Sequence, residues 1–348
     1  MKVTLQDISD DTGFSISTVS RAVRGKGRIS QPNRKKIIAS ARKLGYPVPE
    51  NGPADDQNKT PSVAIITNFK TGEFYSSFFV GFIAAAKNKE LNISLFSVDP
   101  DLEAIDNLIG EVRTLGYSAA VLFIPQLKEK QYRHILETKP KDFPAISCSN
   151  IDNSVLDTVT FDAYQGAVLV SKHFYAQGYR KLGIIEGPFE APEARFRTNG
   201  FTDYVKQSSD AEITWVYPGD YTHESGISAF QHFHESQNKP EAIFATNDAM
   251  ALGFVETARK AGYNIPEDVG LAGFDNLPFC EYHYPKITSV NTDYKLLAEN
   301  TLDNLISRLR SENDRHQGIV SLVPVSLEIR ESSISDNITE QKQKVISG

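Results

Sequence analysis

The N-terminal fold is decided by one stretch, Phe14-Ser15-Ile16-Ser17-Thr18-Val19-Ser20-Arg21-Ala22-Val23. It predicts a short helix with one apolar face, formed by Val19, Ala22 and Val23, and a second face of small hydroxyls and one arginine. Gly13, directly before the stretch, allows a tight turn from a preceding helix because glycine tolerates left-handed backbone angles. The stretch is therefore expected to be the second helix of a small helical domain.

Helices are predicted on both sides of this stretch. Thr4 and Asp7 have the spacing of a capping box, which starts a helix just before the quoted residues. Ser30 is placed to cap a third helix, whose apolar residues repeat at helical spacing until Gly45. Three short helices within 46 residues, with a tight turn before the second, predict a helix-turn-helix domain over residues 1–46.

Charge separates this segment from the rest of the chain. Residues 1–48 hold ten Lys or Arg and three Asp, a net charge of +7. The whole chain carries a formal charge of −7, so residues 49–348 carry −14. A basic helical segment on an acidic chain is typical of a domain that meets nucleic-acid phosphates. Double-stranded DNA is therefore the expected partner of residues 1–46.

The composition of the 348-residue chain, 40% hydrophobic and 23% charged, is that of a globular protein with more than one domain. No apolar run approaches the roughly 18 residues that a membrane span needs, and no secretory signal opens the sequence. The two cysteines, Cys148 and Cys280, are far apart in apolar contexts and are interpreted as reduced core thiols. We therefore expect a cytoplasmic protein without a membrane segment, metal or cofactor.

After residue 61 the pattern changes to buried strands that alternate with helices. One of these helices, predicted over 78–89, places Val80, Ile83 and Ala84 on one face. Such alternation predicts parallel sheets with helices on both faces, and about 270 residues are enough for two of them. The strands are expected at 63–67, 93–98, 119–124, 145–148, 182–185, 242–245 and 270–273, and the other helices at 102–115, 165–177, 195–207 and 248–261.

The N-terminal segments match a known family in residue type and spacing. They are Thr4-Leu5-Gln6-Asp7-Ile8, Gly13-Phe14-Ser15-Ile16-Ser17-Thr18-Val19-Ser20-Arg21, Gly25 and Leu44-Gly45-Tyr46-Pro47. On these residues, the N-terminal segment resembles the DNA-binding headpiece of LacI/GalR-type bacterial transcriptional regulators. The resemblance covers nearly the whole chain. It implies an α/β core like that of periplasmic sugar-binding proteins, with two doubly wound parallel-sheet subdomains.

The expected core spans residues 62–330. The chain of such a core crosses between subdomains three times, and the crossings are expected near Asp162, near Val290 and between Ser321 and Val325. The first subdomain then comprises about 62–161 and 291–320, and the second about 162–290 and 321–330. Residues 331–348 are polar and are expected to form a frayed tail.

Residues 47–61 form the predicted linker between headpiece and core. Four prolines, a glycine and a net negative charge disfavour a helix there. Members of the resembled family usually carry a basic hinge helix at this place, with a leucine that enters the minor groove. No leucine or arginine lies between Leu44 and Val63. We therefore expect operator recognition to depend more on the headpiece in this protein.

Parallel sheets bind ligands outside the carboxyl ends of their strands, so the residues after each strand are the candidate ligand contacts. Arginine and carboxylates there can bridge neighbouring sugar hydroxyls, and aromatic rings can stack on the sugar. Alternatives remain open: Asn247 or Asp248 could cap a helix, Phe74 and Tyr75 could belong to the core, and Arg197 could be a surface charge. The candidates for effector binding are Phe74, Tyr75, Asp162, Tyr164, Arg197, Tyr221, Asn247, Asp275 and Tyr294.

The resemblance supports several of these candidates. Arg197-Thr-Asn-Gly-Phe201 is similar to the family's effector-contacting arginine motif. Ala245-Thr-Asn247-Asp248 is similar to its Asn-Asp motif, and Asp275 to its effector-binding aspartate. Tyr221 falls where many members place a stacking aromatic residue. The resemblance thus implies one small-molecule site between the subdomains.

Within the headpiece, the resemblance assigns base reading to Ile16, Ser17 and Arg21. Arginine can bind guanine through two hydrogen bonds, whereas Ile16 offers only apolar contact. The positions expected to hold phosphates or extend the basic face are Thr4, Ser15, Thr18, Arg24, Arg28, Ser30 and Asn33.

The sequence therefore predicts a ligand-responsive DNA-binding regulator, a repressor that acts as a homodimer, with a sugar as effector. An enzyme is the first competing class, but no phosphate loop, metal cluster or nucleophile motif is present, since Gly226-Ile-Ser-Ala-Phe lacks a second glycine. A sugar-binding solute-capture protein without DNA regulation is the second. The basic headpiece argues against it.

Overall fold

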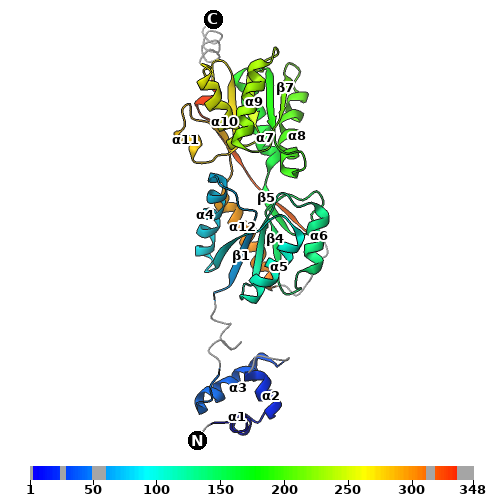
Figure 1. The fold of residues 1–348 in the computed structure, drawn as a ribbon, viewed down its shortest axis with the longest axis vertical. Helices are drawn as coiled ribbons and strands as arrows, with labels where there is room; N and C mark the ends of the chain where they lie inside the picture. The colour runs from blue at the N-terminus through cyan, green and yellow to red at the C-terminus, as the bar shows by residue number, and fades with distance from the viewer. Residues whose placement is uncertain (1–2, 24–28, 49–59, 311–317, 335–348) are drawn as a thin grey trace. The chain divides into compact units, whose positions relative to one another are not determined.

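The computed structural model describes residues 3–23, 29–48, 60–310 and 318–334, and the chain forms two compact units (Figure 1). The first unit comprises residues 1–60 and the second residues 61–348. Within the described residues, no helix is long and apolar enough to cross a membrane.

The first unit is built from three helices, α1 (Leu5–Thr12), α2 (Ile16–Val23) and α3 (Gln31–Leu44). The predicted capping box is present, because Thr4 and Asp7 bond to each other's backbone N–H groups at 3.4 and 2.7 Å. Gly13 ends α1 with a φ of 76°, as the tight turn requires. The small core joins all three helices through Ile8, Val19, Ala22, Val23, Ile37, Ile38 and Ala41.

Ser30 differs from its expected role. It occupies the position before α3, and Pro32 lies in the first turn, but the Ser30 side chain makes no capping hydrogen bond. Pro32 presets the backbone angle of the first turn, so α3 starts without a side-chain cap.

The first half of the second unit is a six-stranded, all-parallel sheet A in the order β11-β5-β4-β3-β1-β2. Helices α4 and α12 cover one face and α5 and α6 the other. Figure 1 shows α12, late in the chain, beside α4. The bounds are β1 (Ser62–Thr67), α4 (Glu73–Asn88), β2 (Asn92–Ser97), α5 (Leu102–Thr114), β3 (Ala119–Phe123), α6 (Glu129–Thr138), β4 (Ala145–Ser147), β5 (Thr158–Phe161), α12 (Tyr294–Arg310) and β11 (Val320–Val323).

The second half is sheet B, in the order β12-β10-β9-β8-β6-β7, with only β12 antiparallel. Helices α7 and α8 pack on one face and α9 and α10 on the other. The bounds are α7 (Ala163–Gln177), β6 (Lys181–Glu186), α8 (Pro192–Gln207), β7 (Glu212–Pro218), α9 (His223–Glu235), β8 (Ala242–Ala245), α10 (Asp248–Lys260), β9 (Gly270–Asp275), α11 (Phe279–Tyr282), β10 (Thr288–Asn291) and β12 (Ser326–Glu328). Two doubly wound sheets, as predicted, thus make up the core.

Three crossings join the sheets, after β5, after β10 and between β11 and β12. Two boundaries differ from those expected by a few residues. Asn291 pairs with Asp275 in sheet B, whereas residues 321–323 pair with β5 in sheet A. Val323 is fully buried beneath α12, so apolar burial keeps β11 in the first sheet.

The predicted start of α4 was wrong, and the apolar face that carries Val80 and Ile83 is not the buried one. The helix begins at Glu73, five residues before the expected start. Its buried face comprises Phe78, Phe82 and Ala85, whereas Val80 and Ile83 are 62% and 49% exposed. Residues 78–86 of α4 are all apolar apart from one glycine, so periodicity alone could not identify the side that faces the sheet.

Residues 331–334 are not a frayed tail. Glu331–Ser333 form a short 3-10 helix, and Ser332 and Ser333 are fully buried. The Ser332 hydroxyl donates to the Leu271 carbonyl at 2.7 Å, and Ser333 lies 2.7 Å from the imidazole of His173. These side-chain bonds anchor the segment to sheet B, and composition could not reveal them. Residues 335–348 lie outside the described residues.

We expect His173 to make the stability of the core depend on pH. Burial lowers the pKa of His173 to about 4, against 6.5 in an unfolded chain. Below pH 6.5 the unfolded chain binds a proton that the folded chain does not, so the contribution of His173 declines as the pH falls from 6.5 to 4, by about 3 kcal/mol. His173→Gln should flatten this part of the dependence, measured by urea unfolding at several pH values.

The matched control is His232→Gln, which alters an exposed histidine on α9. The same pH dependence in wild type and His173→Gln would contradict the assignment.

Candidate functional sites

The first candidate site is the outer face of α2. Val19, Ala22 and Val23 are buried against α1 and α3, which turns the remaining positions outward. Ile16 is 46% exposed although it is apolar, and Ser17 and Arg21 are exposed beside it. An exposed isoleucine between hydroxyls and a guanidinium can contact the edges of base pairs in a major groove. The three predicted base-reading residues therefore share one exposed surface.

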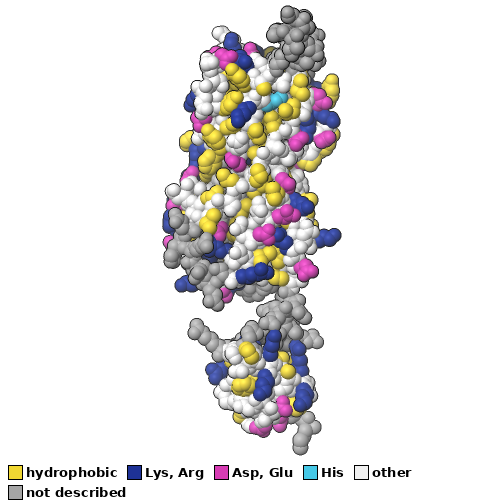
Figure 2. Space-filling view, turned by 180° about the vertical axis from the view of Figure 1, so that it is seen from behind, with side chains coloured by type: hydrophobic (Ala, Val, Ile, Leu, Met, Phe, Trp, Pro, Cys, Tyr) yellow, Lys and Arg dark blue, Asp and Glu magenta, His cyan; other side chains and the backbone are white. Residues whose placement is uncertain are grey.

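The described residues predicted to contact phosphates lie near the starts of all three helices. Ser15 accepts a hydrogen bond from the Thr18 N–H at 3.3 Å and so caps α2, while its hydroxyl lies 2.8 Å from that of Thr18. The Thr4 hydroxyl donates to Asp7 at 2.8 Å, and Ser30 and Asn33 are exposed. Figure 2 shows several Lys and Arg side chains on one face of this unit. Arg24 and Arg28 lie outside the described residues.

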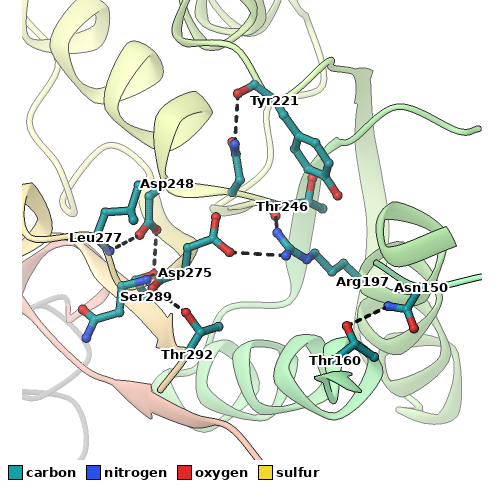
Figure 3. A network of polar contacts seen from close by, with 12 residues as sticks. Asn150, Thr160, Arg197, Tyr221, Thr246, Asp248, Asp275, Leu277, Ser289 and Thr292 are labelled. Carbon is teal, nitrogen blue, oxygen red and sulfur yellow. Dashed lines mark hydrogen bonds and ion pairs between the residues drawn. The ribbon is translucent and has the colours of Figure 1, made fainter. Parts of the chain in front are cut away.

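The second candidate site centres on Arg197, which projects from the second turn of α8. Its Nη1 donates to the Thr246 carbonyl at 2.6 Å, and its Nη2 lies 3.3 Å from Asp275 Oδ1 (Figure 3). The guanidinium also lies over the Phe274 ring, 3.8 Å from its centroid, and 5.5 Å from that of Tyr221. Arg197 is therefore a buried charge held at the carboxyl ends of β8 and β9. The interpretation of Arg197 as a surface charge was wrong.

Asp275 and Tyr221 adopt backbone angles that side chains rarely accept. Their φ angles are 111° and 69°, in the left-handed region. Such strain persists where the surroundings hold it in place, and it clusters at ligand sites. Burial raises the pKa of Asp275, and the guanidinium of Arg197 opposes that rise. The end of β9 is thus built around the ion pair between Arg197 and Asp275.

Asn247 and Asp248 have different roles. Asn247 caps α10 by accepting from the Met250 N–H at 3.0 Å, and its amide donates to the Tyr221 carbonyl at 3.0 Å. Asp248 is fully buried and accepts from Ser289 Oγ at 2.6 Å and from the Leu277 N–H at 2.7 Å. Asn247 therefore positions Tyr221, and Asp248 holds the turn after β9.

Asp248 can take this position because β9 carries a glycine. A side chain at Gly273 would place its Cβ only 2.1 Å from Asp248 Oδ1. Burial and the nearby charge of Asp275 raise the pKa of Asp248. Sequence analysis left Asp248 as a possible cap, and the long-range contact to Ser289 could not be read from the sequence.

Aromatic residues from sheet A and its helices form a second group. Phe74 is half-buried and meets Tyr294 edge-on, with ring centroids 5.8 Å apart. It also contacts Tyr75 at 5.3 Å and Phe123 at 5.4 Å. Burial is the main cause that raises the pKa of Tyr294, and the charge of Asp275 is the second. The aromatic group that contains Tyr294 therefore lies close to the Arg197 cluster. We define the Arg197 cluster as Arg197, Tyr221, Thr246, Asp275 and Glu193.

Asp162 and Tyr164, two further candidates, make local contacts. Asp162 caps α7 by accepting from the Gln165 N–H at 3.0 Å. Tyr164 is exposed and donates its hydroxyl to Asp203 of α8 at 3.2 Å. These contacts position α7 and α8.

Glu193 and Thr246 were missed by the sequence analysis. Glu193 lies one helical turn before Arg197 on α8, and this i, i+4 spacing is the signal that could have indicated it. Among the described residues, Glu193 Oε2, Arg197 Nε, Tyr221 Oη and Thr246 Oγ1 are buried without a hydrogen-bond partner. Burial raises the pKa of Glu193. Buried polar atoms are normally paired, so one unpaired atom on Arg197 and three on its neighbours indicate a site for a polar ligand.

The described residues contain no group of three or more His, Cys, Asp or Glu side chains that could hold a metal ion. The Arg197 cluster instead offers hydrogen-bond donors, acceptors and aromatic faces. This combination suits binding of a small polar molecule.

Comparisons with known proteins agree with the two units. Residues 4–48 match the profile described as bacterial regulatory proteins, lacI family, and residues 171–333 match a periplasmic binding protein-like domain. The chain is 24% identical to the HTH-type transcriptional repressor PurR of Photobacterium profundum, over 94% of this chain and 98% of that protein. It is 26% identical to catabolite control protein A of Priestia megaterium, over 96% of this chain and all of that protein.

Two solved structures share the fold. A Lac repressor dimer bound to operator and the anti-inducer ONPF aligns with a TM-score of 0.72 and 21% identity, over 96% of this chain and all of that one. A complex of the transcriptional regulator CelR with cellobiose aligns with a TM-score of 0.68 and 21% identity, over 95% of this chain and all of that one.

Proposed function

Because this chain belongs to the lacI family of bacterial regulatory proteins, a family of DNA-binding transcription regulators, we propose that it is a repressor controlled by a sugar. The sugar binds at the Arg197 cluster and thereby changes the affinity of the headpiece for operator DNA. The single observation that carries the proposal is the ring of unpaired buried polar atoms around Arg197.

The chemistry of the Arg197 cluster favours a polyhydroxyl ligand. Arg197 already binds Asp275, so their charges offset each other, while Arg197 Nε and Tyr221 Oη remain unpaired among the described residues. A guanidinium and a carboxylate side by side can donate to and accept from neighbouring hydroxyls. The Phe74 and Tyr294 rings supply apolar surface close by. The CelR structure with cellobiose provides a precedent in this fold for a sugar ligand.

Coupling to DNA is supported by polar contacts that join the two subdomains. Glu73 of α4, in the first subdomain, accepts from the Phe279 N–H at 3.1 Å and from the Tyr282 hydroxyl at 2.8 Å, in the second. A ligand that binds one relative arrangement of the subdomains more tightly shifts the population toward that arrangement. The shift alters the spacing of two headpieces in a dimer, and hence operator affinity.

A homodimer is supported by an exposed apolar surface that spans both subdomains. Val80 and Ile83 of α4 project from the first subdomain, and Tyr282 and Tyr284, at and after α11, are exposed on the second. The contact of Glu73 with Tyr282 places α4 beside α11, as Figure 1 also shows. Apolar patches of this kind mark interaction surfaces in globular proteins.

Arg21→Ala is expected to lower operator affinity by about 1–3 kcal/mol and to relax the sequence preference, because it removes a two-bond contact to a base. Operators would be selected from random duplexes and their affinities measured by fluorescence anisotropy. Lys43→Ala is the control, since it removes one positive charge from an exposed position on α3. An unchanged preference in Arg21→Ala would assign Arg21 to the phosphates.

Asp275→Asn should abolish the response to the effector and leave operator binding intact, because the lost charge unpairs Arg197. The effector would be identified by the increase in melting temperature with a panel of sugars, nucleosides and purines. Asp142→Ala serves as the control, because it removes an exposed carboxylate of the first subdomain that pairs with Arg113. A response confined to purines, or one retained in Asp275→Asn, would refute a sugar site at Arg197.

The double variant Val80→Asp/Ile83→Asp is expected to be monomeric, because it places charges at the centre of the proposed interface. Sedimentation velocity at micromolar concentration would measure the mass in solution. Leu115→Asp alters another exposed apolar residue and should remain dimeric. A monomeric wild-type protein, or a dimeric double variant, would count against this interface.

A further inference from the structure

A groove of about 560 Å³ lies between the two subdomains and adjoins the helix that carries Arg197. The first subdomain lines it with Glu129, Arg133 and Asp152, and the second with Phe189 and Arg195. Pocket volumes of about 300–1,000 Å³ are typical of small-molecule sites. The groove is thus large enough for a ligand in its own right.

Helix α8 connects the groove to the Arg197 cluster. Pro192 and Arg195, three residues apart, face the groove, whereas Glu193 and Arg197, four apart, share the neighbouring face. Arg195 of the groove lining precedes Arg197 by two residues, a rise of about 3 Å along the helix axis. The groove lining includes none of the residues of the Arg197 cluster, so a ligand with a single ring at Arg197 would leave the groove empty.

The groove lining holds four cationic side chains, among them Lys128 and Lys130, and three carboxylates, and two of the four cations are paired with carboxylates. Arg133 donates to Glu129 Oε1 at 2.7 Å, and the other oxygen of Glu129 accepts from Asn153 at 2.7 Å. Arg195 pairs with Asp152 across the two subdomains. Paired guanidinium and carboxylate groups present both donors and acceptors, which suits neutral hydroxyl groups.

Phe189 provides an aromatic surface at the edge of the groove. Its side chain is 77% exposed, which is unusual for a large apolar ring. Arg195 fixes this segment, because its Nη1 donates to the Phe189 carbonyl at 2.6 Å and its guanidinium lies 5.7 Å from the ring centroid. An exposed aromatic ring on a fixed backbone is suited to stack on the C–H face of a sugar.

We infer that the effector is an oligosaccharide, with one ring at the Arg197 cluster and the next in the groove against Phe189. This inference rests on the proposed sugar effector and deepens it. Glu193, whose Oε2 is buried without a partner among the described residues, lies between the two positions and accepts a hydroxyl of the bound chain. The ligand touches both subdomains beside the Asp152–Arg195 pair, so its binding favours one subdomain arrangement.

The test compares sugars of increasing length on the full-length protein by calorimetry. The probes are glucose with cellobiose and cellotriose, glucose with maltose and maltotriose, and galactose with lactose. In the series that binds, the disaccharide should bind at least tenfold more tightly than the monosaccharide. Phe189→Ala should weaken the disaccharide about tenfold and leave the monosaccharide within twofold, because only the second ring stacks on Phe189.

Phe196→Ala is the matched control, since Phe196 is an exposed phenylalanine of α8 outside the groove lining. Its affinities should equal those of the wild type. Equal affinity for the monosaccharide and the disaccharide overturns the groove site, and so does a Phe189→Ala variant with wild-type affinity for the disaccharide. The sugar effector remains supported in either case if binding still requires Asp275. Binding of no sugar in any series overturns the sugar effector and the groove site together.

Discussion

The ion pair between Arg197 and Asp275 is the contact on which the ligand-binding half of the structure depends. It joins α8 to the end of β9, and the Thr246 carbonyl adds the end of β8. Both partners are buried, so loss of either one would leave an uncompensated charge at a cost of about 3–5 kcal/mol. The strained backbone of Asp275 is held by this contact and by Thr292, whose hydroxyl donates to the Asp275 carbonyl at 2.8 Å.

The same pair explains why the site suits an uncharged ligand. A lone buried guanidinium would favour an anion, but Asp275 offsets its charge and Glu193 adds a second carboxylate nearby. What remains available is hydrogen bonding from atoms that the protein leaves unpaired. The proposed sugar, and the proposed second ring beside Phe189, both follow from this balance of charge and hydrogen-bonding capacity.

Some of the exposed apolar residues lie where the protein is proposed to meet other molecules. Ile16 lies on the face of α2 proposed for DNA, Val80 and Ile83 on the surface proposed for the dimer, and Phe189 at the groove. Each of these side chains would bury more readily in a core than remain in water. The fold does not require these side chains to be exposed to solvent.

The sequence alone determined much of the local structure: capping residues, Gly13 and helical periodicity predicted the headpiece, and strand alternation predicted two wound sheets. It also indicated Arg197 and Asp275, since strand ends in parallel sheets share an edge. Tertiary structure alone decided which face of α4 is buried, that Ser332 and Ser333 anchor the chain, and that Asp248 binds Ser289. The reason is physical. Caps and periodicity depend on residues a few positions apart, whereas burial and long-range hydrogen bonds depend on segments that only the folded chain brings together.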